Sequence, residues 1–462
     1  MSTSHAKAAK EFLKNPTYAD WHDQTFWGVR SKRDTMANGL PQWEELRQMA
    51  SDIKRHTLTH LGDYLEQFAD NAEKNGAVVH WAQDADEFNS IVLEILQRHD
   101  VKKLVKSKSM LTEECEMNPY LERHGIEVVE TDLGERIIQL NHQAPSHIVM
   151  PAIHLSNDDV GQLFERVLGT EEGNHDPTYL TYAARLSLRD EFLTADAGLT
   201  GGNFGIASTG DVVVCTNEGN ADMATSCPRL HIAAIGLEKI IPDYDCMAVF
   251  HRLLARSATG QPTTVFTSHF RKARPTADKM HIILVDNGRS DWLADPDNWD
   301  MLKCMRCGSC MNTCPVYRSS GGYSYSYFIP GPLGINLGML RDPRKHAGNM
   351  SACSLCLSCQ FVCPVKINLG DKIYAWRQRL KEFGKANSEK ETMCRAMDMV
   401  FQSPKVYNAA TAMLPMANAF SALTNSKVNP WAYAHKMMKF PKKPFHKMME
   451  EETKKKENDK QG

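Results

Sequence analysis

The stretch "CMRCGSCMNTCPVYR", residues 304–318, places four cysteines within eleven residues and a proline directly after the last of them. A second stretch, "CSLCLSCQFVCPVKINL", residues 353–369, repeats this cysteine spacing and the trailing proline. The thiolate of cysteine is a soft ligand, and soft ligands select zinc, copper(I) or iron–sulfur clusters. The two stretches therefore predict a metal-binding region at about residues 300–385.

The spacing of the cysteines distinguishes between these metals. Structural zinc sites usually take two separated cysteine pairs. Here three cysteines follow one another at two-residue gaps, and a fourth comes after a three-residue gap. This is the C-x₂-C-x₂-C-x₃-C-P run of bacterial two-cluster ferredoxins, in which the fourth cysteine ligates the other cluster. The sequence thus predicts two [4Fe–4S] clusters, with a zinc-bearing scaffold as the alternative.

Two such runs are expected to exchange their fourth ligands. The ligands predicted for cluster A are Cys304, Cys307, Cys310 and Cys363. The ligands predicted for cluster B are Cys353, Cys356, Cys359 and Cys314. A proline follows each exchanged ligand and ends the helical path there, because its ring excludes a helix interior. Clusters linked in this way lie close together, so we expect electrons to pass between them.

The residues around the cysteines leave two questions open. Roughly forty residues separate the runs, and this segment is rich in Gly, Pro and Tyr. It either covers the clusters or docks a partner. Four cations flank the cysteines and are interpreted as surface residues rather than as groups that raise the cluster potentials: Lys303, Arg306, Arg318 and Lys366.

Composition limits the other classes of function. The 462 residues suggest about three domains. A net charge of −2 shows no basic excess, which argues against a nucleic-acid partner. There is no run of eighteen apolar residues and no apolar secretory signal at the start, so we expect no transmembrane segment. Thirteen cysteines in such a chain favour a reducing, cytoplasmic location, with any membrane association made through partners.

Hydrophobic periodicity divides the chain into four parts. Residues 1–72 show helical spacing and predict an N-terminal helical segment. Between residues 73 and 290, short β-branched runs alternate with helical stretches, which favours an α/β domain with a mostly parallel sheet. "SHIVMPAIH", residues 146–154, is one of the predicted strands. Residues 291–385 begin with a predicted linker and hold the cysteine region, and residues 386–462 are predicted as a helical segment with a polar tail.

Familiar catalytic motifs are missing. The sequence has no G-x-G-x-x-G and no Walker A motif, so nothing in it predicts a nicotinamide, flavin or ATP site. It also lacks a Ser-His-Asp or H-E-x-x-H arrangement. No complete active site is evident, and whether the chain is itself an enzyme stays open.

Several segments, taken in order, carry a resemblance to a known family. They are "GNFGIASTGDVVVCTNEGNADMATSCPRLHIAAIGLEKIIPD" from residue 202, "HIILVDNGR" from residue 281, and both cysteine runs. Together they resemble the LutB-type iron–sulfur proteins of lactate utilization. The resemblance covers most of the chain, and the C-terminal segment departs from it most. It implies an α/β LUD domain, similar to the sugar-phosphate isomerase and CoA-transferase group, followed by a helical two-cluster ferredoxin domain.

The same resemblance implies a function. The chain would be the electron-transfer subunit of a multi-subunit system that oxidises L-lactate to pyruvate. Its partners would be a cysteine-rich subunit similar to heterodisulfide reductase and a second, shorter LUD protein, with the electron acceptor left open. The alternative is an acyl or CoA transferase whose clusters sense redox state, which needs a carboxylate nucleophile such as Glu218.

A small anion is expected to bind to the LUD domain. In open α/β sheets ligands lie outside the carboxyl ends of the strands. Near one predicted strand end, "GIASTGDVVVCTNEGN" supplies a glycine-rich turn, hydroxyl groups and amides. The candidate binding residues are Asn203, Thr209, Glu218 and Asn220. Ordinary turn chemistry explains the same residue types, and both interpretations stay open.

Overall fold

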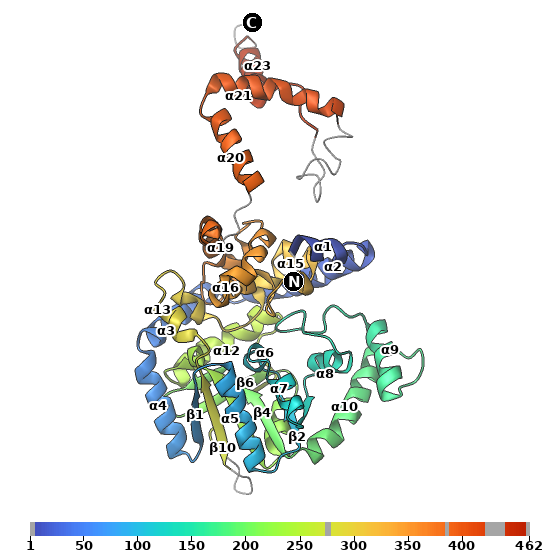
Figure 1. Cartoon of the computed structure of the whole chain (residues 1–462), viewed down its shortest axis with the longest axis vertical. Coiled ribbons are helices and arrows are strands. Elements are labelled where there is room, and N and C mark those ends of the chain that lie inside the picture. Colours follow the sequence, from blue (N-terminus) through green and yellow to red (C-terminus); the bar gives the residue numbers. More distant parts are fainter. Residues whose placement is uncertain (1–4, 273–278, 384–387, 421–438, 459–462) are drawn as a thin grey trace. The chain divides into compact units, whose positions relative to one another are not determined.

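The structure is a computed structural model that describes residues 5–272, 279–383, 388–420 and 439–458 (Figure 1). It forms two compact units, Met1–Leu380 and Lys381–Gly462. The N-terminal helices, the α/β part and the cysteine region, predicted as three domains, therefore make one unit. The reason lies in the N-terminal helices, which contact both of the other parts.

The N-terminal segment is helical, as predicted. Its helices are α1 (His5–Phe12), α2 (Pro16–Asn38), α3 (Trp43–Thr59) and α4 (Leu61–Lys74). Helix α2 begins where the side chain of Asn15 accepts a hydrogen bond from the backbone N–H of Tyr18 and Pro16 takes the first helical position. Helix α2 packs against the cysteine region, whereas α4 contacts the strands of the α/β part.

The main sheet has six strands, all parallel, which confirms the mostly parallel sheet. Its strands are β1 (Val78–Ala82), β2 (Lys103–Lys106), β3 (Glu127–Glu130), β4 (Ala197–Gly201), β7 (Leu230–Gly236) and β10 (Met280–Val285). The spatial order is β1-β10-β7-β4-β2-β3. Successive residues face opposite sides: Leu104 packs in one core, whereas Val105 packs in the other. Both faces are therefore covered, as parallel sheets require.

Helices between the strands form the outer layers. They are α5 (Ala85–Arg98), α6 (Met110–Glu114), α7 (Met117–Arg123), α8 (Leu133–Leu140), α9 (Asn157–Leu168), α10 (Pro177–Thr194), α11 (Asn220–Ser226) and α12 (Tyr244–Ala258). Helices α6 and α7 are separated because Glu116 takes a left-handed φ of 51°. The strand predicted over residues 146–154 is wrong. Two backbone N–H groups there donate to the ring of His147 instead of to a neighbouring strand.

The order of the strands defines where the sheet opens. From β2 the chain moves outward to β3, but β4, β7 and β10 follow on the other side of β2. The connections therefore reverse direction between β2 and β4, and ligands bind at such switch points. A second sheet of order β8-β5-β6-β9 lies in the same unit. Its strands are β5 (Phe204–Ile206), β6 (Asp211–Thr216), β8 (Ile240–Ile241) and β9 (Phe266–Phe270).

The cysteine region is helical, as predicted. Its elements are α13 (Arg289–Ala294), η2 (Trp299–Lys303), α14 (Ser309–Asn312), α15 (Pro315–Ser320), η3 (Gly322–Ser324), α16 (Gly331–Arg341), α17 (Pro343–His346), η4 (Ala347–Ala352), α18 (Ser358–Val362), α19 (Leu369–Gln378) and η5 (Leu380–Phe383). The predicted linker folds as α13 and η2, which pack on each other. Helix α16 in the segment between the runs is buried from Gly331 to Met339 and packs on α14. Figure 1 shows α15, α16 and α19 together beside α1 and α2.

The described part of the second unit is mainly helical and has many exposed apolar side chains. Its described elements are α20 (Ser388–Phe401), α21 (Pro404–Met413), η6 (Leu414–Phe420) and α23 (Phe445–Asn458). Exposed side chains include Met399, Phe401 and Phe445. Among the described residues, no helix is long and apolar enough to cross a membrane.

Buried histidines make this fold sensitive to acid. Burial lowers the pKa of His147 and His231 to about 3, and that of His5, His154 and His281 to about 4. In the unfolded chain histidine binds a proton near pH 6.5. Between pH 6.5 and 4 the unfolded state therefore binds more protons, so stability is lost as the pH falls through this window.

We expect the midpoint of thermal unfolding to fall steeply between pH 6.5 and 4.5. His231→Gln keeps a polar group beside the Thr200 hydroxyl, 2.9 Å from His231 Nε2, but removes the buried base. In this variant, the number of protons taken up on unfolding should fall by up to one. The pH dependence of the free energy of unfolding should then fall by up to about 1.4 kcal/mol per pH unit. The exposed His124→Gln serves as the control. Equal slopes for His231→Gln and the unsubstituted chain would refute this explanation.

Candidate metal centre and adjoining cavity

The two cysteine loops have the same backbone shape. In the first loop Arg306 and Gly308 take left-handed φ angles of 60° and 76°. In the second loop Leu355 and Leu357 take φ angles of 56° and 62° at the equivalent positions. A left-handed conformation costs a non-glycine residue about 1–2 kcal/mol, and such strain persists where the surroundings impose it. Both loops are therefore built to one geometry.

Backbone N–H groups point at the sulfurs in the same way in both loops. The N–H of Arg306 donates to Cys304 Sγ at 3.4 Å, and the N–H of Leu355 donates to Cys353 Sγ at 3.3 Å. The fourth cysteine of each run also accepts a backbone N–H bond, Cys314 at 3.5 Å and Cys363 at 3.3 Å. Hydrogen bonds to the sulfurs are one of the levers that set cluster potentials.

The fourth cysteine of each run lies near the other run. Burial raises the pKa of the Cys314 thiol to about 11. Cys353 and Cys356 are close enough to Cys314 to contribute to this increase. Burial likewise raises the pKa of Cys363, with a contribution from Cys304. This proximity is what the exchange of ligands requires. The assignment of ligands to clusters A and B stays a prediction.

The donor set fits an iron–sulfur group. Burial raises the pKa of the Cys307 thiol to about 12 and also raises the pKa of the Cys359 thiol, so neither thiol would ionise unaided near neutral pH. Only a strongly positive centre brings such thiols into the thiolate form. In the described part of the chain, no three His, Cys, Asp or Glu side chains converge as ligands of one metal ion. The zinc alternative gains no support from these residues.

Cations from other parts of the unit hold the cysteine loops. Arg47 on α3 donates to the carbonyl of Cys363 at 3.0 and 2.8 Å. Lys239, which follows β7, donates to the carbonyl of Cys304 at 2.9 Å. The interpretation of the flanking cations as surface residues is wrong for Lys303 and Arg318, which are both buried. Lys303 donates to Ser51 on α3, so the N-terminal helices fix the loops in place.

The loop that replaces the predicted strand also covers the first cysteine loop. A Cβ at Gly308 would lie 3.1 Å from atoms of both His147 and Val149, so this position has little room for a side chain. His147 Nδ1 accepts two backbone N–H bonds and His147 Nε2 lies 3.0 Å from Asn312 Oδ1. Since Nδ1 accepts, Nε2 carries the proton. The neutral ring therefore ties this loop to α14.

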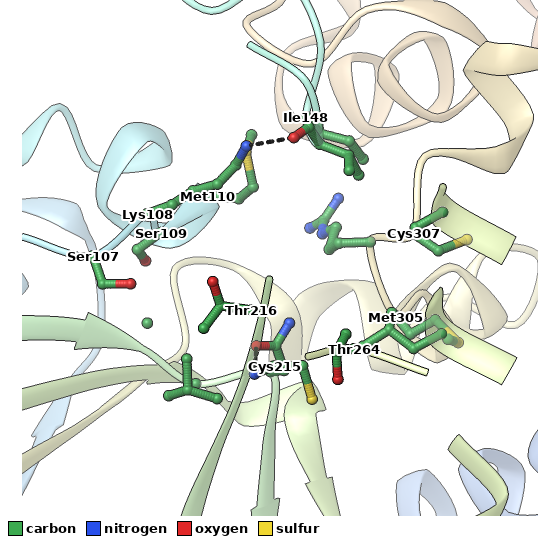
Figure 2. A pocket seen from close by; sticks show the side chains of 18 of the residues that line it. Ser107, Lys108, Ser109, Met110, Ile148, Cys215, Thr216, Thr264, Met305 and Cys307 are labelled. Atoms are coloured by element: carbon green, nitrogen blue, oxygen red, sulfur yellow. Dashed lines mark hydrogen bonds between the residues drawn. The ribbon is translucent and has the colours of Figure 1, made fainter. Parts of the chain in front are cut away.

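A cavity of about 370 Å³ lies between the sheet and the first cysteine loop. One wall is formed at the carboxyl ends of the strands by residues 107–109 after β2, residues 201–203 at the end of β4, and Gly236 at the end of β7. The opposite wall includes residues 305–307 of the first cysteine loop. Figure 2 shows Ser107 and Lys108 on one side of the cavity and Met305 and Cys307 on the other. The cavity therefore joins the switch point of the sheet to the predicted site of cluster A.

Comparison with known proteins agrees with this architecture. Residues 65–290 match the LUD domain, and residues 300–367 match the 4Fe-4S dicluster domain. Lactate utilization protein B of Shouchella clausii is 39% identical over 394 residues, which cover 84% of this chain and 82% of that protein. The chain belongs to the lactate utilization protein B family. It is therefore an iron–sulfur protein with a LUD domain.

Two further relatives agree with this assignment. Lactate utilization protein B of Geobacillus thermodenitrificans is 42% identical over 388 residues, covering 82% of this chain and 81% of that protein. The uncharacterized electron transport protein YkgF of Escherichia coli is 41% identical over 362 residues, covering 77% and 76%. These relatives are thus named for lactate utilization and for electron transport.

Two of the four predicted anion-binding residues line the cavity. They are Asn203 and Glu218. Asn203 Oδ1 accepts the N–H of Cys215 at 2.8 Å, which ties the start of β5 to β6. The Glu218 carboxyl lies at the mouth of the cavity, open to solvent yet crowded by protein. This crowding and the nearby Asp132 raise its pKa.

The other two predicted residues have different places. Asn220 is buried behind the cavity wall and donates to Asp132 at 2.7 Å, so it supports the wall. Thr209 does not line the cavity. It lies in the turn between β5 and β6, where its carbonyl accepts a hydrogen bond from Asn75 at the end of α4. The residues before and after β6 are at opposite ends of the strand, which separates Thr209 from Glu218.

The cations of the cavity come from distant segments. Sequence reasoning missed Lys108, Lys239 and Arg289, and it interpreted Arg306 as a surface residue although its Nη1 is buried. Arg289 lies 3.0 Å from Glu114 and 2.5 Å from Glu238, and all three are buried. These contacts hold the pKa of Glu238 well below its usual range, against the effect of burial. Arg289 ends the quoted stretch "HIILVDNGR", but nothing in that pattern indicates its two partners.

Proposed function

We propose that this chain is the electron-relay subunit of a system that oxidises L-lactate to pyruvate. It would carry two [4Fe–4S] clusters on the ligands predicted for clusters A and B. The observation that supports the proposal most is the matched geometry of the two cysteine loops, each with its fourth cysteine beside the other loop. Loops of this kind are suited to hold two cubanes close together.

The chain's own residues keep the relay in a fixed geometry. When bound, each cluster takes up or gives one electron, so two of them match the two electrons that leave lactate with two protons as pyruvate forms. Backbone N–H groups stabilise the thiolates, and Arg47 and Lys239 fix the carbonyls of two ligands. Five of the eight cysteines are buried, and a rigid surrounding suits transfer between the two sites because little then has to rearrange.

The proposed partners supply what the chain lacks. A cysteine-rich subunit similar to heterodisulfide reductase and a second LUD protein would complete the system, and the electrons would leave to an acceptor outside this chain. Two observations support an assembly of this kind. The relatives are named for lactate utilization and for electron transport, and the sequence has no recognisable complete active site of its own.

A transferase is the weaker candidate. It needs an ionised carboxylate as nucleophile, and Glu218 does line the cavity. However, crowding and Asp132 raise the pKa of Glu218, which disfavours the ionised form. Its carboxyl is also engaged by the backbone N–H of Leu133 at 3.1 Å. These two features favour the relay.

Anaerobic copurification tests the proposal. The chain is prepared with its two proposed partners, L-lactate is added, and reduction of the clusters is followed by EPR. We expect lactate-dependent reduction in the assembly and little or none with the chain alone. Glu218→Gln should leave this reduction in place, apart from any change in substrate affinity. A trapped acyl-enzyme that disappears in Glu218→Gln, with no lactate-dependent reduction, would favour the transferase instead.

A further inference from the structure

We infer that the cavity beside the first cysteine loop binds a small 2-hydroxy or 2-oxo monocarboxylate, with Arg306 and Lys239 as the groups that contact its carboxylate. This deepens the proposed function, because it places recognition of the substrate class on this chain rather than on a partner. The inference is drawn from the residues that line the cavity, so it applies to the oxidation of any small 2-hydroxy acid.

The size and position of the cavity fit a small ligand. Its volume of about 370 Å³ lies at the lower end of the range for ligand pockets. It lies at the switch point between β2 and β4, where α/β sheets bind their ligands. Met110, Ile148 and Met305 add apolar surface that suits a short alkyl group (Figure 2).

The charges near the cysteine loop are not balanced. Two cations of the cavity are already satisfied, Arg289 by its two carboxylates and Lys108 by Glu135 at 2.8 Å. Lys239 donates to the neutral carbonyl of Cys304, and the carboxylate that pairs with it, Glu238 at 3.6 Å, is shared with Arg289.

Arg306 provides the second, unbalanced charge at this wall. Its Nη1 is buried and has no hydrogen-bond partner among the residues that the structure describes. A buried donor without a partner costs about 1–3 kcal/mol. An anion between Arg306 and Lys239 would remove this cost, because a guanidinium can donate two parallel hydrogen bonds to one carboxylate.

The opposite side of the cavity suits a hydroxyl or keto group. Ser107, Ser109 and Thr216 lie there, as Figure 2 shows, and Asp132 and Glu218 add acceptors. A carboxylate at the cationic wall would point its neighbouring carbon toward these groups. The two sides of the cavity thus favour a carboxylate with an oxygen on the adjacent carbon over a simple fatty acid or a phosphate.

Calorimetry on the anaerobic, cluster-loaded chain tests the inference, with L-lactate and pyruvate as probes and propionate and inorganic phosphate as comparisons. We expect L-lactate or pyruvate to bind more tightly than propionate or phosphate. Arg306→Gln should weaken this binding at least tenfold, since Gln keeps an amide donor but loses the charge and the reach of the guanidinium. Arg185→Gln removes the same charge from the exposed face of α10 and should leave binding unchanged. Iron content and the visible spectrum check that each variant keeps its clusters.

A second readout separates this inference from the relay itself. A bound anion next to the first cysteine loop should alter the EPR signal of the reduced chain without partners, and Arg306→Gln should abolish that change. If Arg306→Gln loses its clusters, Lys239→Gln is measured in the same way. Absence of binding, tighter binding of phosphate, or equal binding by the variants would overturn the inference. Lactate binding without lactate-dependent reduction in the assembly would contradict only the proposed relay.

Discussion

Cys314→Ser is expected to remove the cluster whose other ligands are Cys353, Cys356 and Cys359, and to spare the cluster nearest to it in sequence. The reason is that Cys314 lies beside the second loop, although it ends the first run. Serine oxygen is a poorer ligand for iron than the soft thiolate. Iron should fall from about eight to about four atoms per chain, as expected when one of two cubanes is lost.

The measurement combines iron and sulfide analysis with EPR of the reduced protein. Cys227→Ser changes an exposed cysteine outside the runs and should keep the full iron content. The reciprocal variant, Cys363→Ser, should remove the other signal and not the same one. If Cys314→Ser removed the signal that Cys304→Ser also removes, the exchange of ligands would be wrong.

Arg289→Met is expected to lower the free energy of unfolding by about 3–5 kcal/mol. Arg289 is buried between Glu114 and Glu238, which are also buried, and it donates to both. Methionine fills much of the space but leaves two carboxylates without their cation. Removing one partner of a buried ion pair is costly because the remaining charge stays buried without an opposite charge beside it.

Urea unfolding of the cluster-loaded chain under anaerobic conditions measures this effect. Arg98→Met is the matched control, because Arg98 pairs with Glu94 on the exposed face of α5 and such pairs contribute about 0.2–1 kcal/mol. A loss below 1 kcal/mol for Arg289→Met would show that the three buried charges are not coupled as the geometry indicates.

The local patterns of the sequence predicted most of the fold. The N-terminal helices, the alternation of strands and helices and the helical cysteine region all follow from the spacing of apolar residues and cysteines. Strand β4, "AGLTG", could not be predicted, because glycine disfavours strands. Its Gly198 is needed for a close approach: a Cβ there would lie 1.7 Å from the carbonyl oxygen of Ala224 on α11. The reason for that glycine is tertiary and leaves no local pattern.

The candidate site was harder to predict than the fold. Glu218 follows a strand end that the sequence indicates, so placing it there needed only local reasoning, whereas Asn203 follows β4, which the sequence does not indicate. Lys239 and Arg306 meet at one wall only because β7 and the first cysteine loop pack together. Likewise, the apolar run at residues 146–154 is typical of a strand, but the ring of His147 takes up the backbone donors. Side-chain hydrogen bonds of this kind are invisible to hydrophobic periodicity.

Metal and sulfide analysis of the anaerobically purified chain, combined with EPR after reduction by dithionite, tests the central claim most directly. The account predicts a brown protein with about eight iron and about eight acid-labile sulfide per chain. It also predicts signals broadened by magnetic interaction, because two reduced clusters linked through exchanged ligands lie close together. A colourless protein that contains zinc and no labile sulfide would contradict it.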